Sequence, residues 1–320
     1  MKLDLYDRKI LYELDKNSAI SLHKLSSKIR RSKQVVLYRM KRLEEEGIIT
    51  GYNAIIDMSK LGYFTFRTYI KFHSTTEEDG KKFIKFCRKE FSQVWTITSM
   101  HGKWDYALFL GVKNVDEFHN IWDKIFYNYK EKIKNYNVAL YSPIINFNIK
   151  IFLDKVNVQD SIERIYGAGS GEKIDERDIQ IIDIYASNVR QSSIEIAKKL
   201  GISSDTVRNR IKELEKRKII VGYKIGINYE KMGYTGYRLD FQLKSSKRIK
   251  EVYEYFKYHR NIYQINRSIG GADLEIEVIV KNLQELLQII DETKEKFRDT
   301  IMDAEWFGFS IFHIIKYIPD

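Results

Sequence analysis

The sequence is poor in cysteine, in proline and in long apolar runs, and the first and last of these shortages exclude classes of protein. Its 320 residues include one cysteine, Cys87, so neither a disulfide framework nor a cysteine-rich metal site is expected. Apolar runs such as 106–112 fall well short of the roughly 18 residues that a membrane-spanning helix needs. The first residues also lack the apolar core of a secretion signal. We therefore expect a cytoplasmic protein.

Acidic residues are the next shortage, because 55 Lys and Arg outnumber 44 Asp and Glu and leave a net charge of +11. A basic surplus favours an anionic partner. Hydrophobic residues make up 43% of the chain, which is enough for packed cores and excludes global disorder. The two prolines and the abundant Lys, Ile and Tyr are typical of an AT-rich prokaryotic genome, and we expect an archaeal source.

The chain contains an internal repeat. Residues 3–63 align with 174–234 at a shift of 171 without a gap, and 20 of the 61 pairs are identical. The match weakens further on, although HGKWDY (101–106) still aligns with IGGADL (269–274) at a shift of 168. Two copies of one unit are therefore joined by the Gly/Ser-rich run GAGSG. We expect domains at 1–60 (helix-turn-helix), 61–160 (βαββαβ), 174–231 (helix-turn-helix) and 232–320 (βαββαβ), with 161–173 as a flexible linker.

Each copy opens with three amphipathic helical patterns, the last two separated by a very short turn. This arrangement is typical of a DNA-binding helix-turn-helix. Each pattern begins at a residue type that caps helix N-termini. The expected caps are Asp4, Ser21, Ser32, Asp175, Ser192 and Ser203. Alternating apolar residues then follow at 48–56 and 219–227, as in a small wing or a connecting strand.

The second part of each copy alternates between strand and helix patterns in the order βαββαβ. That order predicts a four-stranded antiparallel sheet with both helices on one face, so the fold class is α+β with two ferredoxin-like sandwich domains. Strands are expected at 64–72, 94–100, 105–112, 138–152, 237–243, 262–268, 274–280 and 304–315. Helices are expected at 77–91, 115–129, 247–257 and 283–297. We expect a second sheet to cover the open face, which would carry Phe64, Phe66, Tyr69, Phe72, Tyr237 and Phe241.

Three runs of the first copy, LDLYDRKILYEL (3–14), HKLSSKIRRSKQVVLYRMKRLEEEGIITGY (23–52) and HGKWDYALFL (101–110), resemble the Lrp/AsnC (feast/famine) family of regulators. Members join a helix-turn-helix to a βαββαβ ligand-sensing (RAM) domain and pair through their sheets. The resemblance therefore implies a transcriptional regulator that binds double-stranded DNA, has no cofactor and is not an enzyme. The tandem would be a fused pseudo-dimer, and self-association through the βαββαβ domains is expected.

Charge and helix geometry select the candidate DNA-binding residues. Residues 21–43 hold eight basic side chains and no acidic one, whereas residues 192–214 hold five basic and three acidic. The N-terminal part of the third helix enters the major groove in this motif. The candidates in the first copy are Lys24, Arg30, Arg31, Ser32, Lys33, Gln34, Leu37, Tyr38, Arg39 and Arg42. Those in the second are Ser203, Ser204, Asp205, Arg208, Asn209 and Lys212. Because the two heads differ at their groove-facing positions, we expect two unlike half-sites.

One position departs from the family pattern, in which a glycine precedes the cap serine of the third helix by two residues. The second copy keeps Gly201, but the first has Arg30. If the turn needs a positive φ, a residue other than glycine costs roughly 1 kcal/mol there. A phosphate contact from Arg30 would offset that cost.

The resemblance also implies a small effector, often an amino acid, near the turn between the second and third strands. The matching positions are Gly102, Lys103, Trp104, Asp105, Gly270, Gly271 and Asp273. Glycines allow a ligand to approach the backbone closely, and aspartates are able to accept from an α-amino group. The alternative is that both aspartates only form turns, where this residue is common.

Two other functions stay open on the sequence. Siroheme decarboxylases also carry a tandem of this fold, and His101 lies where a pocket is plausible, although the second copy has Ile269 there. An architectural protein would bind DNA without sequence preference. The sequence shows no phosphate-binding loop, no nucleophile elbow and no paired metal-ligand spacing, so no metal site is expected.

Overall fold

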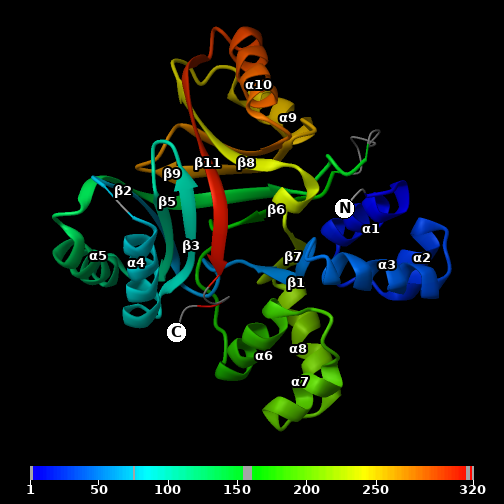
Figure 1. Cartoon of the computed structure of the whole chain (residues 1–320). Coiled ribbons are helices and arrows are strands. Elements are labelled where there is room, and N and C mark those ends of the chain that lie inside the picture. Colours follow the sequence, from blue (N-terminus) through cyan, green and yellow to red (C-terminus); the bar gives the residue numbers. More distant parts are fainter. Residues whose placement is uncertain (1–2, 75, 154–160, 315–317, 319–320) are drawn as a thin grey trace.

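The computed structural model describes residues 3–74, 76–153, 161–314 and 318 (Figure 1). It contains two helix-turn-helix units, a two-stranded sheet between them and a large sheet built from both copies. The domain ends expected at 1, 160 and 320, and the strand end expected at residue 315, lie outside the described residues.

The two helix-turn-helix units start at the predicted positions. The first comprises α1 (Leu5–Lys16), α2 (Leu22–Ile29) and α3 (Lys33–Glu45). The second comprises α6 (Glu176–Ser187), α7 (Ser193–Leu200) and α8 (Ser204–Lys216). All six expected cap side chains accept a backbone N–H of the first helical turn, which satisfies donors that the helix leaves unpaired.

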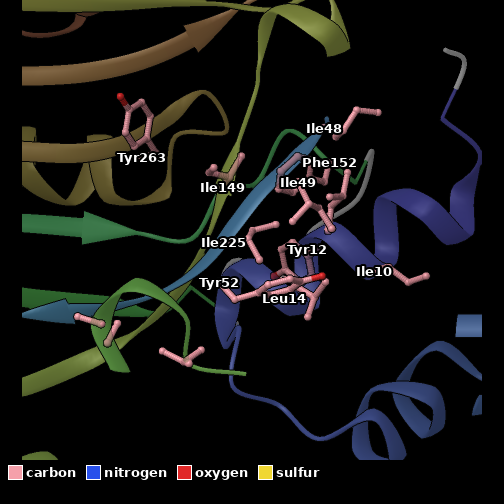
Figure 2. Close-up of a cluster of buried hydrophobic side chains, with 14 of the residues drawn as sticks. Ile10, Tyr12, Leu14, Ile48, Ile49, Tyr52, Ile149, Phe152, Ile225 and Tyr263 are labelled. Carbon is pink, nitrogen blue, oxygen red and sulfur yellow. The ribbon is translucent and has the colours of Figure 1, made fainter. Parts of the chain in front are cut away.

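The strands that follow the two units pair with each other. Strands β1 (Ile49–Ile56) and β7 (Ile220–Ile227) form an antiparallel ribbon in which Tyr52 lies opposite Ile225. A buried cluster surrounds this ribbon and takes side chains from α1, from both helix-turn-helix units and from residues 149–152 (Figure 2). The two heads are therefore packed on one shared core.

The βαββαβ order holds in both copies. The first contains β2 (Phe64–Phe72), α4 (Glu77–Glu90), β3 (Val94–His101), β4 (Tyr106–Val112), α5 (Val115–Tyr129) and β5 (Ile133–Phe147). The second, after the short helix η2 (Glu230–Met232), contains β8 (Thr235–Leu243), α9 (Ile249–Tyr258), β9 (Ile262–Ile269), β10 (Leu274–Val280), α10 (Leu283–Lys296) and β11 (Ile301–Ile314). Strand β6 (Glu163–Tyr166) lies between the copies in sequence.

The two four-stranded sheets close into one ring. The strand order is β2-β4-β3-β11-β8-β10-β9-β5, and β5 pairs again with β2, while β6 adds to β5. The two seams depend on long last strands. Strand β5 pairs with β2 through residues 133–140 and with β9 through 140–146, and β11 does the same with β8 and β3. In Figure 1 the red β11 runs between the two sheets, and the helices lie outside them.

The predicted inner face was largely wrong. Phe66, Phe72 and Phe241 face the helices, and Phe64 is exposed. Side chains alternate along a strand, so the residues between them point into the ring. These include Tyr69, as predicted, but also Arg67 and its repeat counterpart Arg238, both buried.

The segment expected to be a flexible linker is bound to the rest of the chain. Within 161–173, strand β6 pairs with β5, and the backbone of Gly167 and Gly169 donates to Asp57 and Ser59. Arg164 is buried and donates to the carbonyls of Asp15, Lys16 and Tyr223. The Gly/Ser-rich composition predicts a flexible segment, but these hydrogen bonds fix the described part of 161–173 against the rest of the chain.

Candidate nucleic-acid interface and effector cavity

The exposed face of α3 carries the groove-facing candidates of the first copy. Lys33 and Gln34 are exposed. The apolar Leu37 and the aromatic Tyr38 are also exposed, by 41% and 67%. Val36, one residue before Leu37, is fully buried against the other helices. The N-terminal half of α3 thus presents a mixed polar and apolar surface, which is the kind of surface that reads base edges and thymine methyl groups.

Four basic side chains of α2, α3 and the turn between them have no partner among the described residues: Lys24, Arg30, Lys33 and Lys41. Lys24, Arg30 and Lys33 were predicted to contact DNA. The cap Ser32 is also exposed, and its hydroxyl accepts the N–H of Val35. Unpaired cations beside a helix N-terminus are available to phosphates.

Two other predicted DNA contacts are internal ion pairs instead. Arg39 binds Asp4 and Asp7 at 2.7 and 2.8 Å, and Arg42 binds Asp7 at 2.7 Å. Asp7 is only 1% exposed, so these two arginines neutralise a buried carboxylate. Because Arg39 and Arg42 are engaged in these ion pairs, the first copy has fewer unpaired cations than its composition suggests.

Arg31 is partly engaged as well. Its guanidinium lies 3.9 Å from the ring centroid of Tyr6 and donates to the Tyr6 hydroxyl and to the carbonyl of Arg30. The side chain is nevertheless exposed at the head surface. It holds α1 against the turn and still presents charge outward.

The second unit presents a different surface on α8. Asp205, Arg208 and Asn209 are exposed, whereas Ser204 is half-buried. Arg208 and Asp205 form an ion pair, which reduces the charge available to DNA. The exposed Lys212 has no partner among the described residues, and the cap Ser203 hydrogen-bonds Thr206.

The turn before α3 does require a positive φ. Arg30 has φ 58° and Gly201 has φ 65°, and each backbone N–H donates to the last turn of the preceding helix. The first copy therefore keeps an arginine in a left-handed conformation that a glycine would adopt at lower cost.

The two predicted effector aspartates are structural in this fold. Asp105 accepts the backbone N–H of Phe72 at 2.8 Å and binds Lys71 at 2.7 Å. Asp273 accepts the N–H of Leu243 at 2.8 Å, the equivalent bond in the second copy. The turn-forming alternative therefore describes their observed contacts, and Asp105 has no oxygen free of a partner.

The other predicted effector residues surround a cavity of about 220 Å³ inside the ring. Lys103 and Trp104 line it from one copy, and Gly270 and Gly271 from the other. Gly102 lies beside it in the same turn with φ +97°. Gly270, at φ +87°, has no room for a Cβ atom, which would lie 2.5 Å from the carbonyl oxygen of Val138. The cavity is thus formed only when the two copies meet.

Arg67 lies at the base of this cavity and is 1% exposed. Its Nη1 donates to Glu275 and to the Tyr141 hydroxyl, each at 3.0 Å, but its buried Nε has no hydrogen-bond partner in the described chain. Glu275 also binds Arg238, so one buried carboxylate joins the two equivalent arginines. The Arg67 guanidinium thus lines the cavity as a buried cation that Glu275 and Tyr141 hold in place.

Comparison with known proteins matches both helix-turn-helix units, and matches one stretch of about 120 residues to single regulators. A winged helix-turn-helix DNA-binding model matches residues 3–50 and 174–221. The regulator LrpA of Pyrococcus horikoshii is 36% identical over 117 residues, which are 37% of this chain and 83% of LrpA. Ptr1 of Methanocaldococcus jannaschii is 32% identical over 120 residues, covering 37% of this chain and 80% of Ptr1. The chain belongs to the Lrp/AsnC family of transcriptional regulators.

This Lrp/AsnC protein is a DNA-binding regulator with two fused copies of the family unit, as predicted from the repeat. Its fold is also that of the siroheme decarboxylase NirDL, whose crystal structure aligns with a TM-score of 0.63 at 14% identity, over 98% of this chain and 93% of NirDL. At that identity the likeness concerns the fold alone. Among the described residues, no helix is both long and apolar enough to cross a bilayer.

Burial lowers the pKa of His259 to about 4, and its Nδ1 accepts the N–H of Asn261. His101 lies exposed at the end of β3. Within the described residues, no group of three or more His, Cys, Asp or Glu side chains is placed to hold a metal ion.

The inner arginines are the functional candidates that sequence reasoning missed. Arg67 and Arg238 are related by the same shift of 171 that aligns the heads, and that identity was available in the sequence. Their inward direction follows from strand alternation, because each follows an aromatic residue, Phe66 or Tyr237, that packs on the helix side of its sheet.

Proposed function

We propose that this regulator acts in the cytoplasm by placing α3 and α8 in major grooves of two unlike half-sites. The observation that carries this proposal is the difference between the two exposed helix faces. Lys33 and Gln34 on α3 correspond to Ser204 and Asp205 on α8. Gln34 suits adenine, and Arg208 of α8 suits guanine. One chain would then read an asymmetric operator.

The two heads contribute unequally to affinity in this proposal. The first has four unpaired cations on α2, α3 and the turn between them, whereas the Arg208–Asp205 ion pair reduces the charge of the second. Each phosphate contact adds about one unit to the slope of log affinity against log salt. The first head would therefore provide most of the salt-dependent binding.

We further propose that the 220 Å³ cavity takes the effector, an amino acid. The Arg67 guanidinium, which lines the cavity, offers positive charge to its carboxylate, and Asp240 and Glu305, which also line the cavity, offer acceptors to its ammonium group. Trp104 stacks on Tyr69 with ring centroids 5.5 Å apart and would form an apolar wall. Because both copies line the cavity, a bound effector would change the placement of one copy relative to the other.

The names of the relatives support a role without catalysis. The architectural alternative predicts equal affinity for all sequences. Self-association beyond one chain, which the family resemblance implies, belongs to the same proposal and is measured by sedimentation of the free and DNA-bound protein.

Fluorescence anisotropy on the protein's own upstream DNA and on scrambled DNA tests this proposal. We expect a preference of 10³-fold or more. The double variant Lys33→Ala, Gln34→Ala should abolish preference at one half-site, and Arg208→Ala, Asn209→Ala at the other. The exposed pair Lys82→Ala, Lys85→Ala on α4 is the matched control. A strictly palindromic consensus would contradict the unlike half-sites, and equal binding to scrambled DNA would favour the architectural alternative.

The effector proposal has a separate test. Calorimetric titration with a panel of amino acids should give binding to the wild type that Glu305→Gln weakens at least fivefold. The exposed Glu295→Gln on α10 is its control. An amino acid that binds both variants equally would place the effector elsewhere.

A further inference from the structure

A second and larger cavity, of about 860 Å³, lies on the outer side of the second copy's sheet. Its apolar wall comes from both copies. Leu243 at the end of β8, Ile249 on α9 and Leu274 on β10 meet Ile145 and Pro143 on β5 of the first copy. Leu243 and Ile249 are half-buried, although apolar side chains of this size are usually buried inside a domain.

The equivalent place in the first copy is filled by aromatic side chains. The shared Asp–N–H bonds described above identify Leu243 as the counterpart of Phe72, and the register of the following strand identifies Leu274 as the counterpart of Tyr106. Tyr106 packs on Phe72 and Phe83, with centroids 5.8 and 5.2 Å away. Its hydroxyl occupies the space above Gly80, where even a Cβ atom would overlap it.

The larger cavity therefore results from substitutions of one repeat against the other. Aromatic rings seal the site in the first copy, and two leucines leave it open in the second. A large apolar cavity normally destabilises a core. The second copy therefore lacks packing contacts that the first copy makes.

The charges around the cavity indicate that its ligand is an anion. Lys244, Lys250 and Arg267 line it, and none of them has an ion-pair partner among the described residues. Ser99 is the counterpart of Arg267, so this cation too belongs to the second copy alone. Of the two carboxylates present, Asp273 already accepts the N–H of Leu243, and Glu254 lies on the exposed side of α9.

We propose that this cavity binds an amphipathic anion, with an apolar body against Leu243, Leu274 and Ile145 and a carboxylate or phosphate facing the three cations. An α-ammonium group would lie two bonds from the anionic end and among the same cations, so a zwitterionic amino acid is disfavoured. This site is separate from the proposed effector cavity inside the ring, and it does not depend on the DNA-binding proposal.

The probe for the first experiment is 8-anilinonaphthalene-1-sulfonate, whose fluorescence rises in an apolar site. It should bind the full chain at one site. Competition should be strong with 3-phenylpropionate or with phenyl phosphate, whichever anion the site prefers. It should be at least tenfold weaker with phenylalanine and with the uncharged 3-phenylpropanol.

The variants exchange the residues of one copy for those of the other. Leu243→Phe with Leu274→Tyr should refill the cavity and weaken probe binding at least tenfold, and Arg267→Ser should weaken it about fivefold without changing the apolar wall. Lys247→Ala, on the same loop but outside the cavity, should stay within twofold of the wild type. Circular dichroism verifies that each variant is folded.

Two results would overturn the proposal. Probe binding that survives both the refilled variant and Arg267→Ser would place the probe elsewhere. Competition by phenylalanine equal to that by 3-phenylpropionate would show that the site takes a zwitterion. If the refilled variant fails to fold, Arg267→Ser and the competition series still decide the question.

Discussion

Arg30 and Gly201 hold the same left-handed position in the two helix-turn-helix units. A second pair of equivalent positions, after the third helix, shows the reverse assignment, with Gly47 at φ 65° in the first copy and Lys218 at φ 58° in the second. Each copy therefore keeps one glycine and one basic residue where the backbone favours glycine. The two strained residues differ in location. Arg30 lies in the turn before α3, whereas Lys218 lies just after α8.

Replacing either strained residue by glycine should stabilise the protein. We expect Arg30→Gly and Lys218→Gly each to raise the free energy of unfolding by up to about 1 kcal/mol, since glycine adopts positive φ without a steric cost. Only Arg30→Gly should weaken DNA binding, and it should reduce the salt slope by about one unit. Urea denaturation and anisotropy measure the two effects. Equal DNA affinity of both variants would remove Arg30 from the interface.

Arg39 should matter for stability more than for DNA. Arg39→Ala leaves Asp7, which is buried, with Arg42 as its remaining partner, and we expect a loss of about 2 kcal/mol. The slope of affinity against salt should change less than in Lys33→Ala. The measurement is urea denaturation beside a salt series. A stable Arg39→Ala protein with a reduced salt slope would restore the original assignment of Arg39 to DNA.

Arg164 should hold the first head on the ring. Arg164→Met removes donors to three backbone carbonyls and to the Asn146 side chain, and we expect a loss of about 3 kcal/mol. Limited proteolysis should then cut within 161–173 faster than in the wild type. Lys281→Met, at an exposed and unpaired lysine, is the control. Unchanged cleavage would mean that the pairing of β6 with β5 is enough to hold residues 161–173 in place.

Acid should destabilise the protein through His259. Burial, with Lys150 as a second contribution, holds the folded pKa at about 4, against an ordinary value of 6.5. The folded state binds fewer protons, so stability is complete above pH 6.5 and falls as the pH drops towards 4, by up to about 3 kcal/mol. Glu285 and Glu292 oppose this shift and do not cancel it.

Thermal unfolding between pH 4 and 7 measures this effect. His259→Asn keeps an acceptor for the Asn261 N–H and should flatten the profile, whereas His73→Asn, at an exposed histidine, should leave its shape unchanged. A profile that His259→Asn does not alter would assign the acid sensitivity to other groups.

Local signals predicted the elements of this fold well. The six caps and the alternation of strands and helices in each copy are properties of short segments, and Leu274–Val280 and Val115–Tyr129 have the predicted bounds. The strand expected at 138–152 instead begins at Ile133 and ends at Phe147. Its second half pairs with the other copy, and no local pattern contains that partner.

The candidate sites were harder to predict because they depend on partners far apart in sequence. Arg39 has the charge of a DNA contact, but Asp7 lies 32 residues away and engages it. Arg67 and Glu275 are 208 residues apart, and the strand pattern alone did not indicate that they meet. The outer cavity results from differences between equivalent positions of the two copies. The sequence alone does not show which space each of these side chains occupies.

The interlocked strands β5 and β11 have a genetic consequence. In a regulator assembled from two identical chains, every mutation alters both halves at once, so neither half is free to change alone. Here β5 and β11 each complete the opposite sheet, and the two halves stay in one polypeptide with a fixed mutual placement. A substitution in one half leaves the other as it was. Duplication followed by fusion thus allows one head to keep an ancestral site while the other acquires a new one.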